Sequence, residues 1–284
     1  MVGFEAVRFR VCNDRPHVFK DEKGVVHEHF WNEFSNAKWE ADTLALVARL
    51  ARAGAPSLYD FGAWIGPLSL YAAALGLKVV AVEPDPVAFA HLFKNSVVSG
   101  LHDRIELISG ALLCKNAGKL LRLYSDSLGD SETSVASARM RAECLQIIVS
   151  SYISAGITLQ DLLNVYPVKD GAILKFDIEG AEFELMDDIA DAVKIAPVTL
   201  LLSVHPENIT SPEYCDPSTM IEAKRRSMLS SVSKLNRQGR YYWRAMTWRY
   251  GDYFDLMNEV RCRGELIKMI VASSVDLRST LLSA

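Results

Sequence analysis

The stretch Leu58-Tyr-Asp-Phe-Gly-Ala-Trp-Ile-Gly-Pro-Leu68 decides the fold, because it combines a strand, a glycine turn and the start of a helix. The apolar residues before Asp60 predict a buried strand of a parallel sheet. Pro67 suits the first position of a helix, where its missing N–H leaves no hydrogen bond unmade. The loop between such a strand and helix is the place where α/β proteins hold nucleotide-like cofactors.

The charge of this loop separates two cofactor classes. Asp60 stands where the dinucleotide fingerprint G-x-G-x-x-G has its first glycine, and Gly62 and Gly66 follow. A carboxylate there would repel a pyrophosphate but suits a cofactor with ammonium and sulfonium charges, such as S-adenosylmethionine (SAM). Both glycines lack a Cβ and would let the backbone approach a ligand. The motif alone is equally compatible with a structural turn, since glycine turns after strands are common.

A second predicted strand, Lys78–Glu83, also ends in an acid, 23 residues after Asp60. An acid at this point can accept hydrogen bonds from both ribose hydroxyls of a nucleoside. Asp85 and Pro86 then predict the N-cap and first residue of a helix. We expect four apolar side chains to form the buried face of that helix: Phe89, Leu92, Phe93 and Val97.

Three further stretches complete the expected sheet edge. Residues 104–109 predict a third strand, and residues 171–177 and 198–205 each predict a buried strand. The carboxyl ends of parallel strands form the ligand crevice of such folds, so the polar residues there should converge. These residues are Asp60, Glu83, Asp177, Glu179 and His205.

Charged residues are crowded around the end of the strand at 171–177. Lys175, Asp177, Glu179 and Glu182 fall within eight residues. Buried charges are costly unless they are paired or used. Lys175 shares one side of an extended chain with Asp177 and Glu179, so these side chains could pair.

Composition excludes several classes of protein. The 284 residues are 50% hydrophobic, which allows a large core, and the net charge of −4 argues against a dedicated nucleic-acid binder. Five scattered cysteines contain no C-x-x-C pair, so neither a zinc site nor a disulfide framework is expected. Reduced thiols, no apolar signal segment and no run of 18 apolar residues predict a cytoplasmic protein without a membrane span.

Five motifs, in this order along the chain, resemble those of the FkbM-type SAM-dependent methyltransferases. They are Leu58–Gly66, Val80–Asp85, Thr158–Leu163, Leu174–Glu182 and the strand ending in His205. The resemblance implies a class I methyltransferase fold: an α/β protein with a seven-stranded, mostly parallel sheet, helices on both faces and an antiparallel C-terminal hairpin. Residues 241–248 and 265–271 read as the strands of that hairpin. It also implies O-methylation of a hydroxyl on a sugar, a glycan or a secondary metabolite.

The resemblance further implies which residues form the site. The methionine part of SAM would lie against the loop at 60–66, the ribose on Glu83 and the adenine near residues 109–111. The cofactor-binding residues are then Asp60, Gly62, Ala63, Gly66, Glu83, Pro84, Ser109, Gly110 and Asp177. The catalytic residues, which would face the transferred methyl, are His205, Asp177 and Glu179. The chain departs from the family pattern at Trp64, Pro67 and Ser203.

The chemistry needs a base for the acceptor hydroxyl. His205 is the first candidate because an imidazole titrates near neutrality, and a backbone-bonded histidine at a strand end is the alternative. Asp177 or Glu179 would serve if crowding raised its pKa. A divalent cation is possible in this role but is not predicted. His17, His27 and His29 are interpreted as solvated residues rather than metal ligands.

The domain interpretation follows from these motifs. Residues 1–39 are expected to form an N-terminal cap and residues 40–284 the methyltransferase domain, with 112–154 as an insertion that is either a substrate lid or a surface elaboration. The expected partner is a small-molecule or glycan acceptor, not nucleic acid. Two alternatives stay open: a non-catalytic SAM-fold binding or scaffold protein, suggested by Trp64 and Ser203, and a dinucleotide-dependent oxidoreductase.

Overall fold

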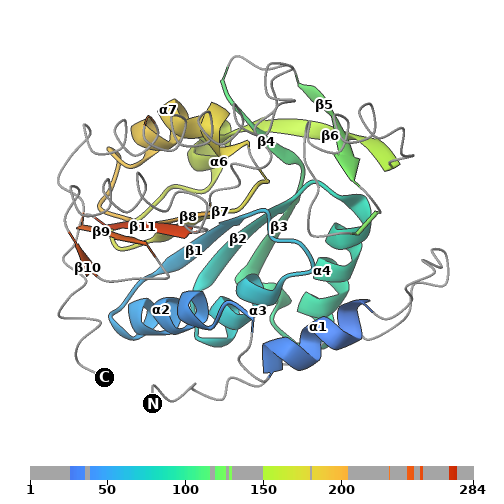
Figure 1. Ribbon diagram of the computed structural model, residues 1–284, viewed down its shortest axis with the longest axis horizontal. Coiled ribbons are helices and arrows are strands. Elements are labelled where there is room, and N and C mark those ends of the chain that lie inside the picture. Colours follow the sequence, from blue (N-terminus) through green and yellow to red (C-terminus); the bar gives the residue numbers. More distant parts are fainter. Residues whose placement is uncertain are drawn as a thin grey trace, which may run out of the picture.

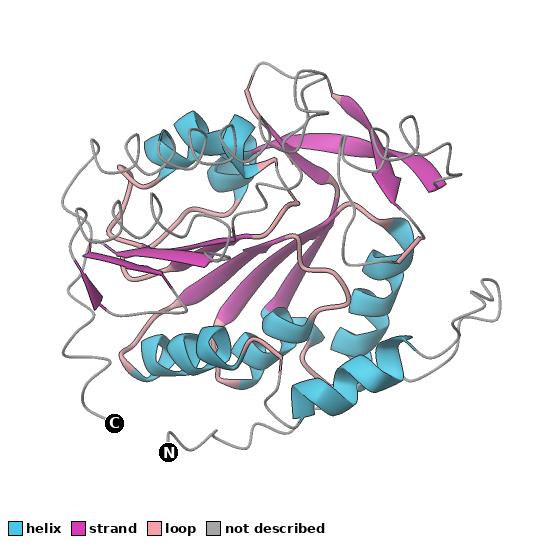
Figure 2. Ribbon diagram, in the orientation of Figure 1, coloured by secondary structure: helices cyan, strands magenta, loops and turns pink. Residues whose placement is uncertain are grey.

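The computed structural model is an α/β fold in which a mixed β-sheet lies between two layers of helices (Figures 1 and 2). One layer contains α1 (Val26–Ser35), α2 (Ala41–Arg52), α3 (Pro67–Ala74) and α4 (Pro86–Val98). The other contains α6 (Leu159–Val165) and α7 (Glu182–Ala192). The structure describes residues 26–35, 39–115, 119–125, 128–129, 150–179, 181–203, 230, 242–245, 250–251 and 269–273.

The main sheet has the strand order β10-β9-β11-β8-β7-β1-β2-β3. Its parallel strands are β1 (Ser57–Phe61), β2 (Lys78–Glu83), β3 (Ile105–Ser109), β7 (Ile173–Phe176) and β8 (Thr199–Ser203). The C-terminal strand β11 (Met269–Ser273) runs antiparallel to both neighbours, β8 and β9 (Tyr242–Ala245). The predicted fold class is therefore confirmed. The described sheet has eight strands rather than seven, because the two-residue β10 (Tyr250–Gly251) extends its edge.

The central strands are buried on both faces, which explains their continuous apolar runs. One core packs this sheet against α6 and α7 and includes Phe61 and Phe176, whose ring centroids lie 4.6 Å apart. The other core packs the sheet against α1, α2 and α3 and includes Leu58 and Leu68. A strand covered on both sides exposes only its ends, so the polar residues at those ends define the site.

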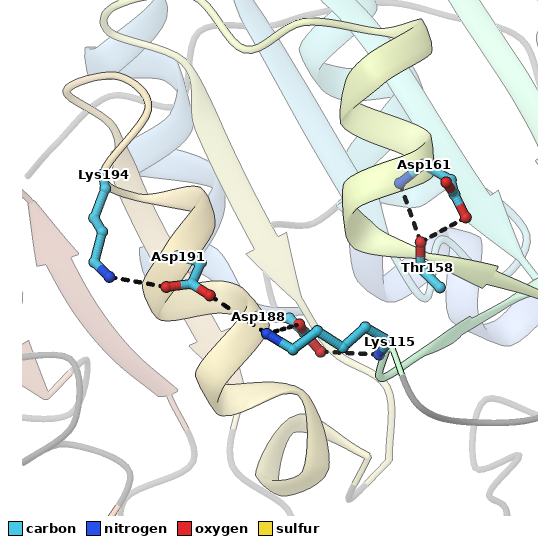
Figure 3. A network of polar contacts seen from close by, with 6 residues as sticks. All are labelled: Lys115, Thr158, Asp161, Asp188, Asp191 and Lys194. Atoms are coloured by element: carbon cyan, nitrogen blue, oxygen red, sulfur yellow. Dashed lines mark hydrogen bonds and ion pairs between the residues drawn. The ribbon is translucent and has the colours of Figure 1, made fainter.

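The predicted helix starts are confirmed. Pro67 is the first residue of α3, and Asp85 caps α4 by accepting hydrogen bonds from the N–H groups of Val87 and Ala88 at 2.7 and 2.9 Å. Thr158 caps α6, and its hydroxyl also donates to the Asp161 carboxylate at 2.7 Å (Figure 3).

The predicted buried face of α4 is partly wrong. Phe93 and Val97 are 54% and 46% exposed, and only Leu92 of the expected set is fully buried. The helix is turned because Asn95 faces inward, where its side-chain amide donates to the carbonyl of Ile65 at 2.9 Å. The inward face of α4 thus includes a buried amide that bonds to a loop carbonyl, and apolar spacing alone does not predict this face. The buried face consists of Ala88, His91, Leu92, Asn95 and Ser96.

The segment at 112–154 contributes to a second, three-stranded sheet with the order β4-β6-β5. Its strands are β4 (Ala111–Leu113), β5 (Leu120–Ser125) and β6 (Ser150–Thr158), and β5 is the added strand expected near residue 120. Lys115 ties the end of β4 to α7 through ion pairs of 3.6 Å with Asp188 and Asp191, and Lys194 also contacts Asp191 (Figure 3). The small sheet is therefore anchored beside the main one.

Several expectations concern parts of the chain outside the described residues. These are His205, the side chains of His17, His27 and His29, and most of the C-terminal third. Among the described residues, no helix is long and apolar enough to cross a membrane.

Candidate functional site

The sheet register brings the ends of β1, β2 and β7 together at one edge. Asp60 on β1 lies beside Ala81 on β2 and Lys175 on β7. Beyond the strands, the N–H of Gly62 donates to the carbonyl of Val82 at 3.0 Å. Asp60, Glu83 and Asp177 consequently meet at the carboxyl edge, as the sequence predicts.

Lys175 joins two of the predicted carboxylates in a buried cluster. Its Nζ lies 3.0 Å from Oδ2 of Asp177 and 3.4 Å from Oδ1 of Asp60. Burial lowers the pKa of Lys175, but the carboxylates of Asp177, Asp60 and Glu40 outweigh it and raise this pKa above its ordinary value. The expected pairing of Lys175 with Asp177 is therefore confirmed.

Asp60 already has protein partners for its charge. The side chain is 1% exposed, and its Oδ2 accepts a hydrogen bond of 2.6 Å from the hydroxyl of Ser69 on α3. With Lys175 beside Oδ1, the carboxylate ties strand to helix across the glycine loop. A contact between Asp60 and the cofactor stays a prediction.

The segment after β7 is held in one conformation by its own side chains. The N–H of Asp177 donates to the carbonyl of Phe61 at 3.0 Å, and the N–H of Ile178 donates to the buried carboxylate of Glu182 at 2.7 Å. Glu179 has a left-handed φ of 53°, which a non-glycine residue rarely adopts. The Asp177 side chain remains 20% exposed at the site. Catalytic roles for Asp177 and Glu179 stay predictions.

Gly62 and Gly66 allow the loop after β1 to pack closely against neighbouring residues. Gly62 has φ 81°, and a Cβ there would stand 1.8 Å from the backbone oxygen of Asp177. Gly66 has φ 94°, and its Cβ would meet a methyl carbon of Leu92 at 2.5 Å. The sequence pattern predicts that these glycines allow a ligand to approach, but a Cβ at either position would point into protein. Close approach of the loops after β1 and β7 thus requires glycine at position 62.

Glu83 is buried and held at both oxygens. Its side chain is 5% exposed; Oε2 accepts from the N–H of Trp64 at 2.7 Å and Oε1 from the N–H of Asp85 at 2.8 Å. Burial raises the pKa of Glu83 to about 8, against the opposing effect of these two hydrogen bonds. Each oxygen has a second lone pair, so the carboxylate can still accept hydrogen bonds from a diol.

The remaining predicted cofactor residues surround Glu83. Ser109 pairs with Glu83 in the sheet register, and the N–H of Gly110 donates to the Glu83 carbonyl at 3.1 Å. Ala63 is buried and Pro84 partly buried in the loops beside it. An adenine next to a ribose on Glu83 would therefore fall near residues 109–110, and this placement stays a prediction.

Sequence comparison gives the family. Residues 60–225 match the Methyltransferase FkbM domain. The chain belongs to the FkbM methyltransferase family. A search among curated proteins finds no match.

Solved structures resemble this FkbM methyltransferase only distantly. An O-methyltransferase from Bacillus cereus in complex with SAH is 13% identical with a TM-score of 0.43, over 90% of this chain and 92% of that one. A SAM-dependent methyltransferase from Agrobacterium tumefaciens is 16% identical with a TM-score of 0.28, over 75% and 52%. At these values the likenesses carry no functional argument.

Trp64 connects three parts of this FkbM methyltransferase. It has a left-handed φ of 51°, and its ring packs edge-on against Phe30 of α1 with centroids 4.7 Å apart. Its indole N–H donates to the carbonyl of Gly129 at 3.0 Å, and the N–H of Gly129 donates to Asp85 Oδ2 at 3.1 Å. Gly129 therefore connects the loops that follow β1 and β2.

Sequence reasoning missed three contributors to the site: Glu40, Ser69 and Gly129. Ser69 lies nine residues after Asp60 on an apolar helix, and this polar interruption is the signal that could have indicated a partner. Glu40 and Gly129 carry no local signal, because both reach the site through tertiary contacts. Among the described residues, no group of three or more His, Cys, Asp or Glu is arranged to hold a metal ion.

The Gly62 packing predicts a large effect of adding one methyl group. We expect Gly62→Ala to destabilise the protein by about 2 kcal/mol or more, because the new Cβ would overlap the Asp177 carbonyl and strain a positive φ. Gly54→Ala is the control: it shares a positive φ, 95°, but its Cβ would meet nothing within 4 Å. Urea unfolding measures both variants, and equal losses would contradict the packing explanation.

The raised pKa of Glu83 predicts a pH-dependent stability. Its ordinary value is 4.5 and its folded value about 8, so the folded state binds the extra proton and the free energy of unfolding falls as pH rises between these values. Glu83→Gln cannot titrate, so its stability relative to wild type should rise over this range.

Urea unfolding at pH 5.5, 7 and 8.5 measures this difference. Glu106→Gln makes the same chemical change at an exposed position of β3, and its offset from wild type should stay constant. A pH-independent offset for Glu83→Gln would refute the assignment.

Proposed function

We propose that this FkbM methyltransferase is a SAM-dependent O-methyltransferase that acts on a hydroxyl of a sugar, a glycan or a secondary metabolite. The observation that carries the proposal is Glu83, a buried carboxylate at the end of β2 beside the glycine loop that follows β1. In an α/β sheet this is the place where a nucleoside diol is bound. The family match to a methyltransferase domain supports SAM as the nucleoside concerned.

The residues present fit such a cofactor. Glu83 would accept the two ribose hydroxyls, Pro84, Ser109 and Gly110 would border the adenine, and the loop at 60–66 would follow the methionine part. Two buried carboxylate oxygens, on Asp60 and on Glu40, accept no hydrogen bond from the protein, which suits a cationic ligand end. When bound, SAM would supply an activated methyl group.

The chain's own residues would then orient the acceptor and remove its proton. Holding the acceptor hydroxyl close to the methyl group would make the transfer effectively unimolecular. His205 would take the proton of that hydroxyl. Asp177 is less suited to this role because Lys175 already holds its carboxylate at 3.0 Å. Glu179 is the second candidate.

Substrate access would involve the segments outside the central domain. We propose the 1–39 segment as a cap, supported by the packing of Phe30 against Trp64. We propose the 112–154 segment as a lid, supported by the two hydrogen bonds of Gly129 to Trp64 and Asp85. The acceptor would be a small molecule or glycan rather than nucleic acid.

A non-catalytic SAM-fold binding protein is the second candidate. The observation in its favour is Trp64, whose indole closes on Gly129 over the cofactor loop. Such a protein would bind SAM without turnover on any hydroxyl acceptor, whereas an enzyme would release SAH with at least one acceptor class.

Calorimetric titration tests the cofactor. We expect SAH to bind with a micromolar dissociation constant and NAD to show no binding. Glu83→Gln should weaken SAH at least about tenfold, because two ribose hydroxyls lose a carboxylate acceptor. Absence of SAH binding at millimolar ligand would overturn the proposed function.

Replacement of His205 tests the base. We expect His205→Ala to lower turnover about 10²–10⁴-fold with any acceptor found active in a sugar and polyphenol panel, while the SAH dissociation constant changes less than about twofold. His102→Ala removes an exposed imidazole and should leave both quantities unchanged. Unchanged turnover in His205→Ala would assign the proton transfer to another group.

A further inference from the structure

Acidic side chains gather around one buried ammonium at the carboxyl edge of the described structure. Among the described residues, the carboxylates of Glu40, Asp60 and Asp177 interact with one ammonium, that of Lys175. Lys175 lies within ion-pair distance of Asp60 and Asp177. A buried carboxylate is costly unless it is paired or hydrogen-bonded, so the partners of each carboxylate oxygen in this cluster matter.

Two oxygens of this cluster are buried and accept no hydrogen bond. They are Oε2 of Glu40 and Oδ1 of Asp60, whose side chain is 1% exposed. The Lys175 ammonium approaches Asp60 Oδ1 to 3.4 Å without hydrogen-bond geometry. Buried acceptors are nearly always satisfied, so two orphans in one cluster indicate that donors are missing.

Glu40 is held in an unusual backbone conformation at this place. It precedes the first residue of α2 with φ 38° and ψ 42°, and its side chain does not cap that helix. A left-handed conformation costs free energy in a residue with a side chain. Burial raises the pKa of Glu40. The ammonium of Lys175 and a hydrogen bond with Thr43 lower this pKa, whereas the carboxylates of Asp177 and Asp60 raise it. The Glu40 side chain thus interacts with the charges of the cluster and also bonds to Thr43 of α2.

Asp60 is the acid that sequence reasoning assigned to the methionine end of the cofactor, but its charge is engaged by Ser69 and Lys175. Glu40 supplies a carboxylate oxygen with no protein donor. We infer that Glu40 binds the α-ammonium group of the methionine end of SAM. The inference rests on the proposed function, since it names the partner of one group of that cofactor.

An ammonium group suits this position better than a metal ion. It brings three N–H donors and one positive charge, which would satisfy the orphan oxygens of the carboxylates. A divalent cation would need several ligands converging on one point, and the described residues contain no such set of three. Glu40 would accordingly discriminate between ligands by their α-amino group and leave the adenosine end unaffected.

A thermodynamic cycle between protein and ligand isolates this contact. The protein forms are wild type and Glu40→Gln. The ligands are SAH and a deamino analogue of SAH, in which hydrogen replaces the α-amino group and the carboxylate is retained. Calorimetry gives the four dissociation constants. Asp42→Asn is the matched control, because it removes a carboxylate from the same end of α2 at an exposed position.

We expect Glu40→Gln to weaken SAH at least about tenfold and the deamino analogue less than about twofold, because only SAH carries the charge that Glu40 binds. Asp42→Asn should change neither constant. Glu40→Gln without ligand should unfold at a denaturant concentration equal to or above that of wild type, since no protein hydrogen bond to Oε2 is lost.

The possible results separate the two proposals. Equal weakening of both ligands, or no weakening of SAH, would overturn the role of Glu40 while leaving SAM binding intact. A clear loss of stability in unliganded Glu40→Gln would also overturn it, because Glu40 would then support the fold. If wild type binds neither ligand, the proposed function fails and this inference with it.

Discussion

The ammonium group of Lys175 is buried where β1 and β7 end, between the carboxylates of Asp60 and Asp177. Removing one member of such a cluster would leave an uncompensated buried charge, which typically costs about 3–5 kcal/mol. The two strands must therefore keep the register that pairs Asp60 with Lys175. This pairing fixes the positions of the loops that follow the two strands. It thereby also fixes the positions of the groups that a ligand could contact.

Three loops at the carboxyl edge behave as one packed unit. The loop after β1 approaches the Asp177 backbone so closely that position 62 admits only glycine. Glu83 bonds to the N–H groups of Trp64 and Asp85, which joins the loops after β1 and β2. Gly129 then bonds to Trp64 and Asp85. The carboxylate of Glu83 and the backbone of Gly129 thus share two partners, Trp64 and Asp85.

Local signals identified most of the framework. Apolar runs located β1, β2 and β7, and the N-caps Asp85 and Thr158 were recognisable because a cap acts within one helical turn. The same reasoning misplaced the face of α4, where Phe93 and Val97 are exposed. The inward side chain there is Asn95, which serves a carbonyl 30 residues away. Apolar periodicity predicts the helix, but it does not indicate which tertiary neighbour needs a polar partner.

The sequence by itself determined the sheet, the family and the convergence of Asp60, Glu83 and Asp177, because strand ends and short motifs are encoded by neighbouring residues. The tertiary structure alone decided how their charges are shared. It paired Asp60 with Lys175 and Ser69, and it buried one oxygen of Glu40 that accepts no hydrogen bond. The interacting side chains belong to four separate elements, α2, β1, α3 and β7, and come together only in the folded protein. Their separation along the chain therefore conceals which carboxylates interact with Lys175.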